Sequence, residues 1–256
     1  MGGLKTRKNG ENIMQLPTKR SGISKDWKSQ KFLMIGMAGI GKSDFWQHAE
    51  NPLYIEAEAG LNFIDACKVQ CRGWNDVKEI ITSLNNATKA NEFNYDLLIV
   101  DTIDRILNYA EQETLDWAKA KYSKSNIMVI SDIPNGAGWD IRRQLLNKFL
   151  KAIEPLPCAK ALIGHVEDKQ IEEMGQNQYH KQTISIGGKI GGDILAWSDH
   201  TLHIAGILMG DELKRTVYTK PTKSREAKSR GGIVRDGWKW SADSKDNFAK
   251  LREQFN

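Results

Sequence analysis

The amino-acid sequence predicts an α/β fold with a mostly parallel central sheet, helices on both faces of the sheet, and a C-terminal β-hairpin. Three observations predict this fold class. A glycine-rich motif at 36–43 follows a short apolar run and precedes a helical segment. Apolar runs at 97–100 and 159–163 have the length and composition of strands buried on both faces of a sheet. Two strand-like segments within 200–219 flank a Gly-Asp turn, which indicates a hairpin.

The motif at 36–43 matches G-x-x-x-x-G-K-[ST], the phosphate-binding P-loop, at every fixed position. Its glycines allow a tight turn whose backbone N–H groups point at one spot. Lys42 can reach the β- and γ-phosphates of ATP, and the Ser43 hydroxyl can bind Mg²⁺. The alternative is a glycine-rich turn that binds nothing. We expect ATP and Mg²⁺ to bind at Gly36, Met37, Ala38, Gly39, Ile40, Gly41, Lys42, Ser43 and Asp44.

Size and composition restrict the class of protein. The chain has 256 residues, of which 40% are hydrophobic and 27% charged, as in soluble globular proteins. No stretch is apolar for long enough to cross a bilayer, and the first residues contain no apolar signal segment, so we expect a cytoplasmic protein without membrane contact. No paired C-x-x-C motif is present, so we expect reduced thiols in or near the core at Cys67, Cys71 and Cys158.

Basic residues concentrate towards both ends of the chain, whose formal net charge is +5. The first cluster lies in a segment without apolar periodicity, so we expect a basic flexible arm at 1–28. The second cluster spans 214–239. Each cluster indicates either a polyanionic partner, most simply nucleic acid, or solvated surface charge. We expect the core of the protein at 29–232 and a C-terminal tail with a short helix at 233–256.

Acidic residues follow two of the predicted strands. The segment 53–60 is expected to form a strand that places Glu56 and Glu58 on one face at its carboxyl end. Ligands of α/β folds bind at this edge of the sheet, where a carboxylate can orient and deprotonate the water that attacks a γ-phosphate. The alternative is a pair of solvent-facing acids. Asp101 follows the apolar run at 97–100, where it can hold Mg²⁺.

Thr102 and Asp104 lie next to Asp101 in the sequence. Asp104 either assists the site or caps a helix at 105–122. The remaining expected elements are a short strand at 68–71, a helix at 74–86, an apolar run at 127–130 that is a strand or a helix-end contact, a turn at 134–138, a helix at 139–153 and a last helix at 244–255.

His165 ends the predicted strand at 159–165. By analogy with Asp101 it can contact the γ-phosphate at the same edge of the sheet; the alternative is a hydrogen-bonded histidine at a strand end. Residues 166–190 are polar and contain glycine, which predicts a long loop whose order depends on nucleotide state. The side chains of this loop that suit stacking on bases and pairing with phosphates are Tyr179, His180, Lys181 and Lys189.

The order of these features resembles the RecA-like P-loop NTPase core. The segment 54–61 resembles the RecA segment that ends in the catalytic glutamate, which implies that role for Glu58. The segment 98–102 resembles the Walker B strand. His165 falls where RecA has a γ-phosphate sensor, and the loop after it falls on the second DNA-binding loop.

A further part of the resemblance concerns subunit contacts. The segment 215–222 resembles the hairpin strand whose lysines reach across the subunit interface, and Lys220 matches one of them. Gly73-Trp74, 101–104 and His165 resemble phage-encoded RecA-like ATP-binding proteins, with greatest similarity to the Sak type-four single-strand annealing group. The resemblance covers roughly residues 28–232. It implies annealing or accessory recombination rather than full strand exchange.

We therefore expect an ATP-binding and ATP-hydrolysing phage recombination protein that acts on single-stranded DNA, with catalytic roles for Lys42, Glu58, Asp101 and His165. An added cation stabilises a transferring phosphoryl group, so we expect a homo-oligomeric ring or filament in which a neighbouring subunit supplies Lys220, Lys223 or Arg225. A single-strand DNA-binding protein is a further candidate partner. The alternatives are a helicase or helicase-loader ATPase of phage DNA replication, and a nucleotide-switched DNA-binding module.

Overall fold

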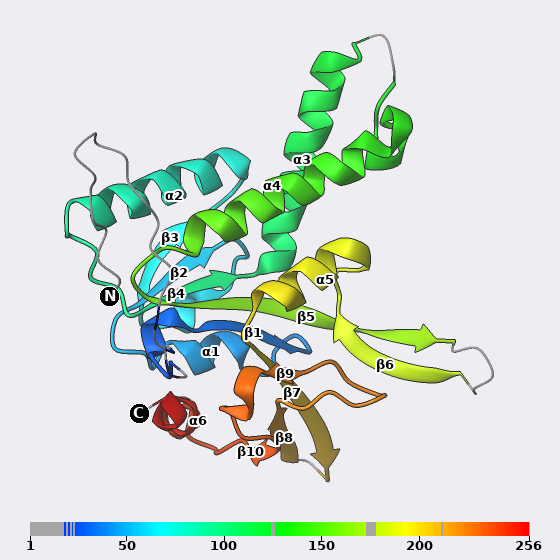
Figure 1. Cartoon of the computed structure of the whole chain (residues 1–256). Helices are drawn as coiled ribbons and strands as arrows, with labels where there is room; N and C mark the ends of the chain where they lie inside the picture. The colour runs from blue at the N-terminus through cyan, green and yellow to red at the C-terminus, as the bar shows by residue number, and fades with distance from the viewer. Residues whose placement is uncertain are drawn as a thin grey trace.

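The computed structural model describes residues 18, 20, 22, 24–123, 126–172, 178–210 and 212–255. Within these residues, a ten-stranded sheet has the order β10-β8-β7-β1-β5-β4-β2-β3, with β6 paired to β5 and β9 paired to β7 (Figure 1). The strands are β1 (Lys31–Gly36), β2 (Pro52–Glu56), β3 (Cys67–Gln70), β4 (Leu97–Asp101), β5 (Ala159–Ile171), β6 (Tyr179–Ile184), β7 (His200–Met209), β8 (Glu212–Tyr218), β9 (Lys228–Ser229) and β10 (Trp238–Lys239). The helices are α1 (Lys42–Trp46), α2 (Trp74–Lys89), α3 (Ile103–Lys121), α4 (Ala137–Ile153), α5 (Gly188–Trp197) and α6 (Ser244–Arg252).

The centre of the sheet is parallel. Strand β1 pairs in parallel with β5 and β7, β4 pairs in parallel with β5 and β2, and β2 pairs in parallel with β3. Strands β8 and β10 extend the sheet in antiparallel orientation. The predicted α/β class with a mostly parallel sheet is confirmed, and the hairpin predicted within 200–219 is the β7–β8 pair.

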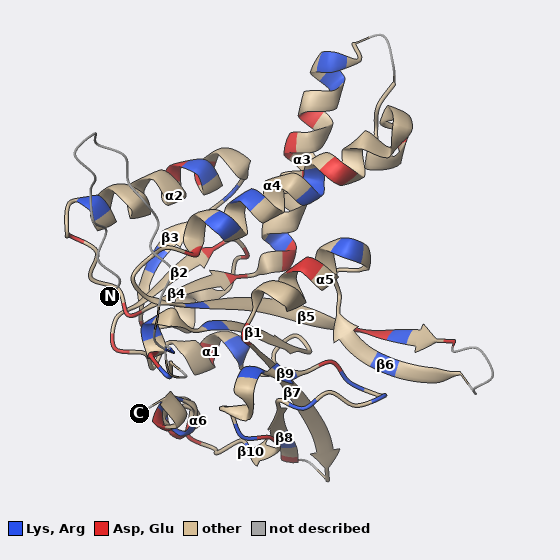
Figure 2. Ribbon diagram, in the orientation of Figure 1, with Lys and Arg blue, Asp and Glu red and all other residues tan. Residues whose placement is uncertain are grey.

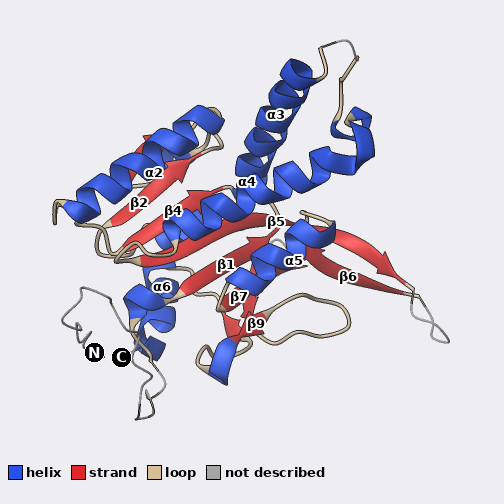
Figure 3. Ribbon diagram, turned by 45° about the horizontal axis from the view of Figure 1, so that its top comes forward, coloured by secondary structure: helices blue, strands red, loops and turns tan. Residues whose placement is uncertain are grey.

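Alternate residues of β1 serve the two faces of the sheet. Leu33 and Ile35 join a hydrophobic cluster that includes side chains of α2, α3, α4 and α5, whereas Phe32 and Met34 join a second cluster with side chains of α1 and α6. Figure 3 shows α2, α4 and α5 lying across one face of the strands. Because both faces are covered, the buried strands are apolar at most positions, which made them readable in the sequence.

The predicted loop at 166–190 is wrong. Strand β5 continues to Ile171 and pairs with β6 in antiparallel register, with Val166 opposite Ile184, and α5 begins at Gly188. This ribbon projects from the sheet in Figure 1. Most of its β5 side chains beyond Val166 are exposed, so a polar sequence forms it and no apolar pattern marks it. Glycine content hid α5, although Gly191 is required there because a Cβ would lie 2.0 Å from the Ile186 carbonyl oxygen.

Helices α3 and α4 extend past the sheet as an antiparallel pair (Figure 1). Their far ends are held by a separate hydrophobic cluster of Leu115, Ala118, Ile127, Ile130 and Ile133. Of the two alternatives for the apolar run at 127–130, the contact at the helix ends is therefore confirmed, and the strand is wrong. The turn expected at 134–138 contains a short 3₁₀ segment, Pro134–Gly136, directly before α4.

The segment 233–255 packs on the same face as α1. Phe248 and Phe255 lie in one cluster with Trp27 and Phe32, with the rings of Trp27 and Phe248 5.8 Å apart edge to face. Most of the arm expected at 1–28 lies outside the described residues, although Trp27 is buried in this cluster.

The cysteines differ in exposure. Cys71 and Cys158 are buried, and burial raises the pKa of each thiol to about 11. Cys67, expected in or near the core, is exposed because it lies on the edge strand β3. None of the helices in the described part of the chain combines the length and the apolar composition needed to cross a bilayer.

Candidate nucleotide-binding site

The P-loop connects the carboxyl end of β1 to α1, as the sequence predicted. Gly41 adopts a φ of +99° and Gly39 a φ of +72°, both in the region that favours glycine. At Gly36 a Cβ would lie 2.9 Å from the Ile204 carbonyl oxygen, so the neighbouring strand β7 leaves no room for a side chain. The three motif glycines are therefore explained by backbone geometry at two positions and by close packing at the third.

Lys42 is buried beneath the loop. Its Nζ donates hydrogen bonds of 2.9 Å to the Gly36 carbonyl and 2.8 Å to the Met37 carbonyl. Burial lowers the pKa of Lys42, and the charges of nearby carboxylates, of which Asp101 contributes most, oppose this shift. Two carbonyl oxygens of the loop thus hold the ammonium group in place. A bound phosphate group can take over these hydrogen bonds.

Ser43 and Asp101 form the adjacent pair. The Ser43 hydroxyl donates a 2.5 Å hydrogen bond to Asp101 Oδ2. Burial raises the pKa of Asp101, and the hydrogen bond from Ser43 opposes this shift. A buried carboxylate beside a hydroxyl is a set of hard oxygen donors, so this pair would suit Mg²⁺. Within the described ranges no group of three or more His, Cys, Asp or Glu side chains could form a protein-only metal site.

Glu58 lies just beyond the end of β2. Its backbone N–H donates to the Asp101 carbonyl at 3.1 Å, and its Oε2 accepts a 3.1 Å hydrogen bond from the Thr102 hydroxyl. The predicted strand at 53–60 is too long, because β2 ends at Glu56 and the chain turns there. Glu56 consequently does not share the site of Glu58: its Oε1 faces the Leu61 N–H at 3.4 Å.

His165 and Asp104 meet at the same edge of the sheet. The His165 backbone N–H donates to Asp104 Oδ2 at 3.2 Å, and His165 Nδ1 lies 3.6 Å from the same oxygen. Asp104 Oδ1 accepts a hydrogen bond from the Ser185 hydroxyl. Thr102, not Asp104, caps α3, because the Thr102 hydroxyl oxygen accepts from the Arg105 N–H. Asp104 therefore links His165 to the segment between β6 and α5.

These side chains surround one cavity of about 330 Å³. It brings together residues from the P-loop, the segment after β2, the end of β4 and the middle of β5. The strand predicted at 159–165 is too short, because β5 continues to Ile171, but His165 still lines the cavity. Its polar lining comprises Lys42, Ser43, Asp44, Glu58, Asp101, Thr102 and His165.

Two residues that support the loop were missed in the sequence. The Tyr54 hydroxyl donates a 2.7 Å hydrogen bond to the Ser43 carbonyl, and burial raises the pKa of this phenol. Arg215 on β8 donates from Nη1 to the Ile40 carbonyl at 3.0 Å and lies over the Trp240 ring, 5.4 Å from its centroid. Neither periodicity nor motif spacing marks these residues, since their roles depend on strand pairing and on a segment far along the chain.

The cations expected to act across a subunit interface lie away from the P-loop of their own chain. Lys220 follows β8, with its backbone N–H bonded to Asp236 Oδ1 at 2.9 Å. The Arg225 guanidinium stacks on the Tyr218 ring at 3.5 Å, and Lys223 Nζ lies 5.7 Å from the Tyr179 ring centroid. None of Lys220, Lys223 and Arg225 lines the P-loop cavity described above.

The expected DNA-binding residues belong to regular elements rather than to a loop. Tyr179, His180 and Lys181 are on β6, and Lys189 is in the first turn of α5. Lys181 Nζ forms a 2.7 Å ion pair with Glu226, and Figure 2 shows basic residues on β6 and on the segment between β8 and β9 that faces it. The residues are thus brought near one another, but Lys181 already has an acidic partner.

Comparison with known proteins identifies the family of the chain. The fold and the P-loop define a P-loop NTPase of α/β architecture. A family described as "AAA domain" matches residues 28–231, and the chain belongs to this family. The SPbeta prophage-derived uncharacterized protein YorG of Bacillus subtilis (strain 168) is 31% identical over 90 residues, which are 34% of this chain and 28% of that protein. The chain therefore matches less than a third of that relative's length.

Among solved structures, the KaiC-like protein PH0186 of Pyrococcus horikoshii OT3 is similar with a TM-score of 0.46 and 12% identity. The match covers 85% of this chain and 88% of that one.

Proposed function

We propose that the protein is a Mg²⁺-dependent ATPase that couples ATP binding and hydrolysis to work on single-stranded DNA in phage recombination. The observation that carries the ATPase part is the convergence of Lys42, Ser43, Asp101, Glu58 and His165 on one cavity. A P-loop lysine, a magnesium-binding pair and a carboxylate for water are the parts that phosphoryl transfer to water requires.

The reaction assigns one task to each side chain. Lys42 exchanges its carbonyl partners for β- and γ-phosphate oxygens. The Ser43–Asp101 pair would hold Mg²⁺, which would supply positive charge for the transferring phosphoryl group. Glu58 orients a water and takes its proton as the water oxygen attacks the γ-phosphorus and the bond to the β–γ bridging oxygen breaks. Thr102 fixes the Glu58 carboxylate through its hydroxyl.

Coupling to DNA is assigned to the ribbon β5–β6. His165, a γ-phosphate sensor in this proposal, contacts Asp104, which bonds Ser185 next to β6. A change at His165 on loss of the γ-phosphate would alter this contact and shift the ribbon that carries Tyr179 and Lys181. An aromatic ring with neighbouring cations suits stacking on bases and pairing with phosphates. Lys220, Lys223 and Arg225, which lie outside their own cavity, would reach ATP only from a neighbouring subunit.

The test is steady-state ATP hydrolysis with and without single-stranded DNA over a range of salt. We expect strong stimulation that fades as salt rises, because phosphate contacts release counterions. Lys42→Ala should abolish ATP binding. Glu58→Gln should bind ATP and lose hydrolysis by at least about a hundredfold, whereas the matched variant Glu56→Gln should retain it. Full ATPase activity in Lys42→Ala would overturn the ATPase proposal; intact ATPase without stimulation would overturn only its DNA part.

A further inference from the structure

The tip of the β7–β8 hairpin is apolar on both of its faces. Ile207, Leu208, Met209 and Leu213 are 65%, 70%, 57% and 46% exposed. Leu208 pairs directly with Leu213 across the strands, so these two share one face, while Ile207 and Met209 point to the other. Among the described residues, none of the hydrophobic clusters includes these four side chains. A projecting ribbon with this much exposed apolar surface is typical of an interaction site.

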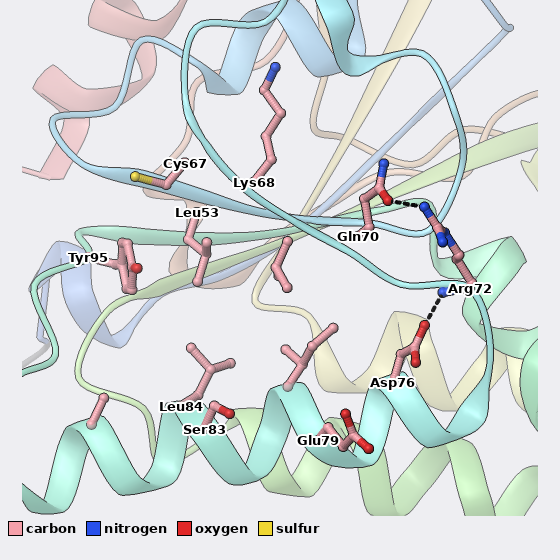
Figure 4. Close-up of a pocket in the computed structure, with 13 residues that line it drawn as sticks. Leu53, Cys67, Lys68, Gln70, Arg72, Asp76, Glu79, Ser83, Leu84 and Tyr95 are labelled. Carbon is pink, nitrogen blue, oxygen red and sulfur yellow. Dashed lines mark hydrogen bonds between the residues drawn. The ribbon is translucent and has the colours of Figure 1, made fainter.

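An apolar groove lies at the opposite end of the sheet. Strand β3 is the last strand at that end, and the groove of about 780 Å³ runs between β3 and α2. Figure 4 shows Leu53 from the sheet and Leu84 from the helix pointing into it, with Tyr95 at one end. Charged residues line it as well: Arg72 just after β3, and Asp76 and Glu79 on the helix. The Lys68 side chain points away from α2 and donates to the Leu61 carbonyl.

We propose that the β7–β8 hairpin tip of one copy of this chain inserts into the α2–β3 groove of a second copy. The apolar side chains of the tip would fill the apolar part of the groove. The tip also carries Glu212 and Lys214, whose side chains are 76% and 54% exposed. They complement the charges of the groove, so that Glu212 can face Arg72 while Lys214 faces Asp76 or Glu79.

The position of the two surfaces dictates the kind of assembly. Because tip and groove lie at opposite ends of one sheet, each contact leaves a free tip on one copy and a free groove on the other. Such head-to-tail contacts produce a closed ring or an open filament, not a two-fold dimer. This inference adds a specific interface to the proposed function and does not depend on DNA or on hydrolysis.

Cys67 provides a direct test, because it is exposed and lines the groove, while Cys71 and Cys158 are buried. Chains carrying Met209→Cys and Cys67→Ser are mixed with wild-type chains and treated with a short bismaleimide. The expected product is a covalent dimer and nothing larger, since the dimer retains no second reactive pair. Met209→Cys alone, with Cys67 retained, should give a ladder.

Two controls define the failure of this test. In the first control, the Met209→Cys, Cys67→Ser chains are mixed with Cys67→Ser chains in place of wild type, and no dimer of this kind should form. In the second control, chains carrying Met128→Cys and Cys67→Ser are mixed with wild type. They should also give no dimer, since Met128 is 68% exposed but lies at the α3–α4 end. Dimers at equal yield in either control, or no dimer in the test mixture, would overturn the inference.

Sedimentation velocity gives an independent readout. Met209→Glu should weaken self-association at least about tenfold, because it places a charge in an apolar contact, and Met128→Glu should not. Ser83→Trp, which fills the groove from an exposed position, should act like Met209→Glu, while its exposed neighbour Thr82→Trp should not. A monomeric wild-type chain that still hydrolyses ATP would overturn this interface and leave the ATPase proposal standing.

Discussion

The guanidinium of Arg215 donates a 3.0 Å hydrogen bond to the carbonyl oxygen of Ile40, which joins the β7–β8 hairpin to the P-loop within one chain. The same guanidinium lies against Gly41, where an added Cβ would meet its Nη1 at 2.9 Å. The Arg215 side chain does not line the cavity, so it acts on nucleotide through the loop backbone. It is a positioning residue.

Replacing Arg215 should therefore weaken ATP binding. Arg215→Ala removes one charged hydrogen bond worth about 1–2 kcal/mol, which corresponds to an ATP Kd raised about five- to thirtyfold. A titration with a fluorescent ATP analogue measures the change. Lys239→Ala, which removes an exposed cation from the neighbouring strand β10, is the matched control. An unchanged Kd in Arg215→Ala would show that the loop keeps its conformation without this bond.

Asp101→Asn should separate metal binding from nucleotide binding. The amide oxygen can still accept the Ser43 hydroxyl bond, but the charge that attracts Mg²⁺ is lost. We expect ATP affinity in EDTA to stay within about twofold and hydrolysis with Mg²⁺ to fall at least about a hundredfold. Isothermal titration with and without Mg²⁺ distinguishes these effects. Equal hydrolysis in the two proteins would exclude Asp101 as a ligand of the reaction's metal.

Asp104→Ala should uncouple the cavity from the β5–β6 ribbon. It removes the contacts to both His165 and Ser185, while the side chains that hold phosphate and Mg²⁺ remain. We expect the basal ATPase rate to stay within about threefold of wild type. The ratio of DNA affinities between the ATP-bound and nucleotide-free states should be at least about fivefold smaller than in wild type. Fluorescence anisotropy with labelled DNA gives that difference. Glu167→Gln, on the same ribbon outside this network, should keep the wild-type difference.

His200 should make the protein less stable in acid. Burial lowers its pKa from 6.5 to about 4, and Lys228 and Arg230 add to the shift. Its ring nitrogens face Gln30 and Ser229, and its ring packs against Phe32 and Phe255. The unfolded chain binds the proton more readily, so the free energy of unfolding falls as pH drops from 6.5 towards 4, by at most about 3 kcal/mol.

Denaturant unfolding at several pH values measures this loss. His200→Gln removes the titrating ring, so its unfolding free energy should vary less between pH 6.5 and 4 than that of wild type, even if it is lower throughout. An identical pH slope in both proteins would assign the acid sensitivity to other groups.

The sequence predicted the centre of this molecule better than its margins. The buried strands were readable because burial on both faces favours apolar residues. The P-loop was readable because a tight phosphate-binding turn requires glycine at particular positions. Glu58 and Asp101 were placed in the cavity because parallel strands bring their carboxyl ends to one edge. His165 lies there too, although β5 continues beyond it. Their detailed contacts, such as Thr102 with Glu58, depend on side-chain orientation and were not readable.

Other features depend on partners distant in sequence. The ribbon from Val166 to Ile184 is polar because solvent surrounds much of it, so composition alone predicted a loop. Arg215 lies within the basic cluster at 214–239, but its bond to Ile40 follows from the pairing of β8 with β7 and of β7 with β1. Glu56 was grouped with Glu58 because alternation was assumed to continue past the point where β2 ends.

The aromatic contacts of α6 have a practical consequence for shortening the chain. The AAA domain match ends at residue 231, yet Phe248 and Phe255 cover Trp27 and Phe32. A chain cut at the family boundary would expose these rings to water and lose β10 from the sheet. We expect such a fragment to aggregate during purification, so expression vectors should keep the coding sequence through Phe255.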